Sequence, residues 1–138
     1  MSAIPIIGHV DSFHLKKAVN ALENGKLVIF AGGTGNPLVT TDTAASLRAI
    51  EIGADILLKA TRVDGVYDAD PEKVAGAKKY DKVSYTEVLN KELDVMDMSA
   101  FFQCHQYALP ICVFDVTKPG ALVKILEGDV EGTLISGE

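Results

Sequence analysis

AGGTGNPLVTTD, residues 31–42, is the stretch that decides the fold of this chain. It follows an apolar run, residues 27–30, that predicts a buried parallel strand, and it precedes an alanine-rich pattern that predicts a helix over residues 43–52. Its glycines allow backbone N–H groups to approach a ligand, and the first turn of the helix adds unpaired N–H donors and the positive end of a dipole. The stretch therefore indicates either an anion site or a tight turn in which Thr41 or Asp42 caps the helix.

The loop lacks the commonest nucleotide motifs. Gly33-Thr34-Gly35 continues as Asn-Pro-Leu, so the third glycine of the dinucleotide fingerprint is missing, and no Gly-Lys-Ser/Thr follows as in a P-loop. Threonine hydroxyls and the amide of Asn36 supply neutral donors in its place. A phosphate group suits such a loop.

The run from Phe30 to Leu47, together with LKATRVDGVYDADP at residues 58–71, resembles the bacterial UMP kinases of the amino acid kinase family. The resemblance continues through VMD (95–97), LPI (109–111), KPGA (118–121) and GTLI (132–135), so it covers nearly the whole chain. Members of that family begin with a strand, a lysine and a glycine-rich loop that hold the ATP phosphates, and none of these occurs here. The resemblance is therefore to the C-terminal part of such an enzyme, and we expect a domain truncated at its N-terminus.

The resemblance implies transfer of the γ-phosphoryl group of MgATP to UMP, giving UDP in pyrimidine nucleotide biosynthesis, with Mg²⁺ as cofactor. It implies that UMP contacts a run of consecutive residues: Thr34, Gly35, Asn36, Pro37, Leu38, Val39, Thr40 and Thr41. It places ATP against Thr61, Tyr67 and Asp70, in a segment that the residues alone would predict to be a structural turn. It also implies a hexamer that GTP activates and UTP inhibits.

Two residues are candidates for the catalytic step. Asp42 matches the aspartate that in related kinases orients the lysines at the reacting phosphates, and its alternative role is that of a helix cap. Lys59 ends a predicted strand and is the candidate for a contact to the transferring phosphate oxygens; alternatively, its stem is buried and its ammonium reaches water. Phosphoryl transfer mainly needs positioning and charge stabilisation, so no Ser-His-Asp arrangement is expected. The remaining cations belong to the missing part, and we expect the 138 residues alone to have negligible kinase activity.

Two other functions fit the same residues. One is a non-catalytic nucleotide-binding or assembly module that needs a partner chain. The other is a sibling kinase that acts on glutamate, aspartate, acetylglutamate or carbamate, although GTGNP followed by TTD favours UMP kinase. Competition between UMP and acetylglutamate for binding would distinguish a UMP kinase from a sibling kinase.

The rest of the pattern predicts one α/β domain over residues 1–138, with a mostly parallel sheet covered by helices on both faces in three layers. Asp11 or Ser12 is expected to cap the first helix, and Ser84 and Asp97 to cap later ones. Residues 73–82 read as a polar loop. Further helices are predicted over about residues 12–24 and 119–128, and further strands over residues 55–60, 111–116 and 132–136.

The composition of the chain argues against several classes of binding partner and site. The net charge of −6 argues against a nucleic-acid or anionic-membrane surface, and no apolar run approaches the roughly 20 residues of a membrane span, so a cytoplasmic protein is expected. Cys104 and Cys112 have no metal-ligand spacing and are expected to be reduced, and the scattered histidines predict no metal site. An N-terminally truncated domain should also expose apolar surface and self-associate.

Overall fold

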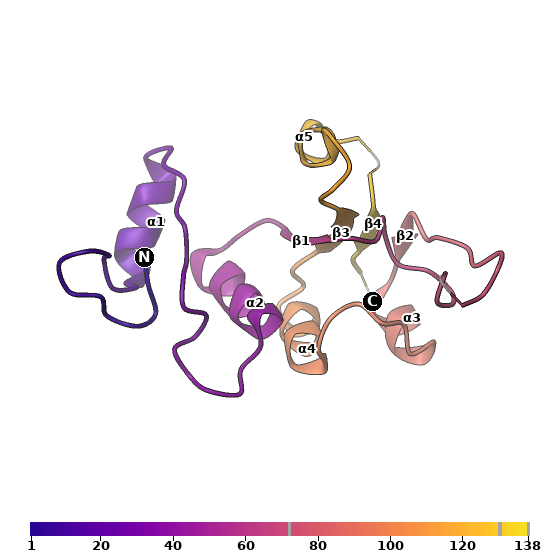
Figure 1. The fold of residues 1–138 in the computed structure, drawn as a ribbon, viewed down its shortest axis with the longest axis horizontal. Coiled ribbons are helices and arrows are strands. Elements are labelled where there is room, and N and C mark those ends of the chain that lie inside the picture. Colours follow the sequence, from indigo (N-terminus) through magenta and orange to yellow (C-terminus); the bar gives the residue numbers. More distant parts are fainter. Residues whose placement is uncertain (72, 130, 138) are drawn as a thin grey trace.

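The computed structural model describes residues 1–71, 73–129 and 131–137. Along these residues, two helices, two strands and two further helices are followed by a strand, a helix and a last strand (Figure 1). The helices are α1 (Leu15–Glu23), α2 (Thr41–Ile52), α3 (Tyr85–Asn90), α4 (Met98–Gln106) and α5 (Ala121–Glu127). The strands are β1 (Leu57–Thr61), β2 (Lys82–Val83), β3 (Ile111–Asp115) and β4 (Thr133–Ile135).

The strands form one sheet in the order β1-β3-β4-β2. β1 pairs parallel to β3, with Lys59 opposite Val113, and β2 pairs parallel to β4. β3 and β4 are antiparallel, with Ile111 opposite Ile135. Two of the three pairings are parallel, which agrees with the predicted mostly parallel sheet, and β1 lies at an edge.

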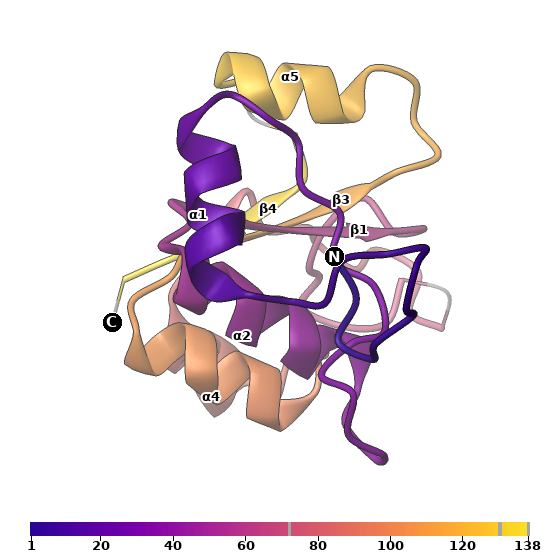
Figure 2. The same ribbon diagram turned by 90° about the vertical axis from the view of Figure 1, so that its left-hand side faces the viewer.

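Helices cover both faces of the sheet, as predicted. α5 lies over one face, whereas α2, α3 and α4 lie over the other (Figure 1). The core forms between the sheet and the second group, where Phe101, Cys104 and Ile111 are almost completely buried. α1 lies to the side, beyond α2 (Figure 1). The Arg48 guanidinium of α2 sits 3.7 Å from the centre of the ring of Phe13, which lies just before α1. In Figure 2, α1 is the helix nearest the viewer.

The predicted strand over residues 27–30 is wrong. The segment has no place in the sheet, and the side chains of Leu27 and Ile29 are 86% and 70% exposed. Its backbone bonds run to the start of the chain, where the Met1 amino group donates to the Ile29 carbonyl and Ala31 N–H donates to the Met1 carbonyl. An apolar run becomes a strand only where a continuous ladder of partners is available, and here the partners supply isolated bonds.

Most helix ends were predicted correctly. Ser84 and Asp97 cap α3 and α4, and Gly53 and Gly128 end α2 and α5 in the left-handed conformation that glycine adopts without strain. The N-cap of α1, however, is His14, which makes no side-chain capping bond, so Asp11 and Ser12 do not cap this helix.

Three further details refine the predicted pattern. The segment predicted as a loop, residues 73–82, ends in the first residue of the short strand β2, which has only two residues and so leaves no periodicity to read. Cys104 and Cys112 are both free and buried, as expected, and burial raises the pKa of Cys104 to about 11. Among the described residues, no helix is both long and apolar enough to cross a membrane.

Candidate active site

The two candidate catalytic residues contact each other. Lys59 Nζ lies 2.5 Å from Asp42 Oδ2, although the residues come from different elements, β1 and the first turn of α2. Their side chains are only 24% and 29% exposed. α2 begins at Thr41, and its N-cap is Thr40, whose hydroxyl accepts a bond from Thr43 N–H. The prediction that Thr41 or Asp42 caps this helix is therefore wrong, and the Asp42 carboxylate is left to hold Lys59.

The ion pair borders two cavities. The larger, of about 340 Å³, has Asp42, Lys59, Thr61, Asp94 and Asp97 as its polar lining. The smaller, of about 200 Å³, shares Asp42, Lys59 and Met96 with the first and adds Thr41. The ammonium group of Lys59 is thus fixed at the wall of a polar hollow, where it can meet an anion.

Asp97 joins the N-termini of two helices at this site. Its carboxylate accepts bonds from the hydroxyls of Thr40 (2.5 Å) and Thr43 (3.0 Å) and from the backbone N–H of Ala100 (3.0 Å). Burial alone would raise the pKa of Asp97, but these hydrogen bonds outweigh burial and hold the pKa below its usual value. The start of α2, which carries Asp42, is therefore anchored to α4.

The residues predicted to contact UMP are divided between two environments. Thr40 and Thr41 lie next to Asp42, and Thr41 lines both the smaller cavity beside the ion pair and a separate apolar groove. The preceding six lie in an exposed loop, in which only Thr34 is partly buried and Leu38 is fully exposed with a φ of 65°. Figure 2 shows this loop reaching away from the start of α2. The structure does not bring these six residues to the ion pair.

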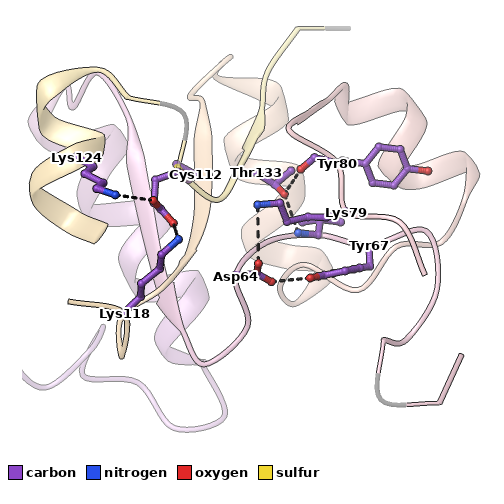
Figure 3. Close-up of polar contacts among 10 residues, drawn as sticks. Asp64, Tyr67, Lys79, Tyr80, Cys112, Lys118, Lys124 and Thr133 are labelled. Carbon is purple, nitrogen blue, oxygen red and sulfur yellow. Dashed lines mark hydrogen bonds and ion pairs between the residues drawn. The ribbon is translucent and has the colours of Figure 1, made fainter. Parts of the chain in front are cut away.

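The residues predicted to contact ATP are also divided. Thr61 lines the larger cavity, and its hydroxyl accepts a bond from Val63 N–H. Tyr67 and Asp70 are not among the residues that line it. Tyr67 donates its hydroxyl to Asp64 (2.7 Å; Figure 3), and this hydrogen bond is the main reason that the pKa of Tyr67 is raised. Asp70 is exposed and forms an ion pair with Lys73.

Comparison with known proteins decides the family. The model of the amino acid kinase family matches residues 4–115. This chain belongs to the amino acid kinase family.

Relatives within the amino acid kinase family include the uridylate kinase of Coxiella burnetii, which is 58% identical over 135 residues and is matched over 98% of this chain and 56% of its own length. The uridylate kinase of Shewanella amazonensis is 56% identical over the same shares of the two chains. The crystal structure of UMP kinase from Bacillus anthracis superposes with a TM-score of 0.94 at 40% identity, covering 98% of this chain and 56% of that one. The chain thus spans about half the length of the curated relatives it matches.

Two residues of the larger cavity and one buried residue outside it were missed or only partly recognised from the sequence of this amino acid kinase chain. Asp97 was recognised as a helix cap, but its bonds to Thr40 and Thr43 span more than 50 residues and leave no local signal. Asp94 stands just before the VMD motif that carried part of the resemblance, and that position was the available clue. Thr133 lies in the GTLI motif, and it contacts the segment that contains Tyr67.

Proposed function

We propose that this chain carries the phosphate-facing part of a UMP kinase, an enzyme that transfers the γ-phosphoryl group of MgATP to UMP to give UDP. The observation that supports it most is the Asp42–Lys59 pair at the wall of a polar cavity. Its relatives include a uridylate kinase and a UMP kinase, and the substrate is proposed from them.

In this proposal Lys59 stabilises negative charge on the transferring phosphoryl group. The Asp42 carboxylate holds the ammonium in place, so little reorganisation is needed when charge develops. The UMP phosphate is already anionic near neutral pH, so the transfer needs no general base. The residues therefore act by positioning and electrostatics.

The acceptor nucleotide is proposed to bind along Thr34–Thr41. The N-terminus of α2 supplies N–H donors and the positive end of its dipole for the UMP phosphate. The exposed loop before it would then close over the nucleotide, since its six exposed or partly exposed residues lie outside the two cavities. ATP is proposed to lie against Thr61, Tyr67 and Asp70.

Mg²⁺ would neutralise phosphate charge in this reaction. In the part of the chain that the structure describes, no three His, Cys, Asp or Glu side chains converge on one point, and the carboxylates of Asp42 and Asp97 already have partners. Mg²⁺ commonly keeps several waters and binds through one or two carboxylates together with substrate phosphates. The residues therefore fit an ion that arrives with ATP, with Asp94 as the remaining carboxylate in the lining of the larger cavity.

A hexameric assembly, activation by GTP, inhibition by UTP and a cytoplasmic location are proposed on the resemblance alone. The 138-residue chain by itself is proposed to turn over negligibly, because the described cavity offers Lys59 as its lysine and no arginine.

A chimera tests the proposal. This chain replaces the matching 135 residues of the Coxiella burnetii relative, and UDP formation is measured with UMP and MgATP. We expect turnover at a rate usual for kinases, about 1–100 s⁻¹. A folded chimera that phosphorylates acetylglutamate and not UMP would favour a sibling amino acid kinase, and one that binds nucleotide without turnover would favour a non-catalytic module.

A further inference from the structure

One buried hydroxyl outside the cavity contacts the segment proposed to bind ATP. Thr133, the first residue of β4, is completely buried. Its hydroxyl accepts a bond from Val66 N–H at 2.8 Å and donates one to the Tyr80 carbonyl (Figure 3). Val66 and Tyr80 are far apart in sequence from Thr133, so the hydroxyl links β4 to two other parts of the chain.

Those two parts are paired with each other. Tyr80 N–H donates to the Val66 carbonyl, Asp68 N–H donates to the Lys78 carbonyl, and Tyr67 and Lys79 form an antiparallel bridge. Residues 66–68 and 78–80 therefore make a short two-stranded arm. The Thr133 hydroxyl bonds to one residue of each strand, so a single side chain fastens both strands of the arm to the sheet.

Neighbouring glycines leave room for this fastening. A Cβ on Gly65 would lie 2.4 Å from the Thr133 hydroxyl oxygen. The backbone φ of +154° at Gly65 is also one that residues other than glycine rarely adopt. A Cβ on Gly132 would lie 2.2 Å from the Val113 carbonyl oxygen, so Gly132 is needed for the close approach of β4 to β3. Residue 65 is thus restricted to glycine by the Thr133 side chain, and residue 132 by the backbone of Val113.

We propose that Thr133 is a positioning residue that holds the arm, and through it Tyr67, in the geometry required to bind ATP. Tyr67 follows Val66 directly, and its hydroxyl reaches back to Asp64, whose carboxylate also lies 3.9 Å from Lys79 on the other strand of the arm. Release of Val66 would therefore move Tyr67 and its partners together. The inference rests on the proposed function, because ATP enters only through it.

The test compares Thr133→Val, Thr133→Ser and Thr133→Cys with Tyr85→Phe as a matched control. Tyr85 also buries a hydroxyl, which donates to the Leu109 carbonyl, away from the arm. In the 138-residue chain, Thr133→Val is expected to speed hydrogen exchange at the Val66 amide by about tenfold, because that N–H loses its acceptor. Thr133→Ser should restore slow exchange, and Tyr85→Phe should leave it unchanged.

In the chimera with the Coxiella burnetii relative, Thr133→Val is expected to raise KM for ATP by about tenfold while kcat and KM for UMP change by less than about twofold. Thr133→Ser should rescue KM, and Thr133→Cys, a weaker donor and acceptor, should be intermediate. An unchanged KM for ATP, or an equal change with Tyr85→Phe, overturns the inference alone. A folded wild-type chimera that makes no UDP overturns the proposed function and with it the role toward ATP.

Discussion

The ammonium of Lys59 and the carboxylate of Asp42 lie 2.5 Å apart, with about three quarters of each side chain covered by the protein. Covering an ion pair costs hydration that its Coulomb attraction repays only in part, so such a pair contributes little to stability. Its position between two cavities is more readily explained by binding of an anion. This residue-scale feature supports the proposed transfer of a phosphoryl group.

Because the two side chains act together, their substitutions should not be additive. In the chimera, Lys59→Met and Asp42→Asn are each expected to lower kcat by about a hundredfold or more, and the double variant should be little worse than the worse single one. Steady-state kinetics of UDP formation measures all three. Lys16→Met, at an exposed lysine on α1, is the control and should keep full activity. Multiplied losses in the double variant would show that the pair does not work as a unit.

At the scale of elements, the start of α2 depends on α4. Thr40 caps α2, and the same hydroxyl donates to Asp97, which caps α4. The two helices lie side by side under the sheet (Figures 1 and 2). Asp97 therefore fixes both the local end of its own helix and the position of the turn that carries Asp42.

Asp97→Asn should reduce the free energy of unfolding by about 1 kcal/mol at neutral pH, because a carboxylate that accepts several hydrogen bonds is replaced by an amide. The folded-state pKa of Asp97 lies below the ordinary 3.8, so its contribution is complete above that pH and is lost as the pH falls through the lower folded-state pKa. The difference between wild type and variant should therefore shrink in acid.

Urea unfolding at several pH values measures the Asp97 effect. Asp55→Asn, at an exposed position before β1, is the control and should cost little at any pH. A difference between wild type and Asp97→Asn that stays constant down to the strongest acid tested would contradict the assigned cause.

The helix ends show what sequence could predict. Ser84, Asp97, Gly53 and Gly128 act through bonds to residues a few positions away, so their types and spacing were sufficient. The apolar residues 27–30 led to a wrong prediction of a strand, since a strand is defined by partners elsewhere in the chain. The bond from Thr40 to Asp97 could not be predicted for the same reason. Asp42 and Lys59 were identified as candidates, but only the packing of α2 against β1 shows that they meet.

At the scale of the whole molecule, much apolar surface is uncovered. β1 is an edge strand, and a groove of about 540 Å³ lined mainly by apolar residues runs between residues 30–33 and α2. Leu27 and Ile29 shortly precede Phe30, which lines this groove, and their side chains are largely exposed. Exposed edges and apolar patches of this kind favour association.

We therefore expect the chain to self-associate. Light scattering over a wide concentration range should give a mass that rises above the 14.7 kDa of one chain. Leu27→Lys combined with Ile29→Lys should lower the association, because both side chains are already exposed and the change costs little in folding. A well-behaved monomer of 14.7 kDa at high concentration would contradict this expectation.

The most direct test of the central claim is the rate of UDP formation from UMP and MgATP, measured for the Coxiella burnetii chimera beside the 138-residue chain alone. The Asp42–Lys59 site predicts turnover of about 1–100 s⁻¹ in the chimera and background in the chain. A folded chimera without turnover, or a lone chain that works at a kinase's usual rate, would contradict it.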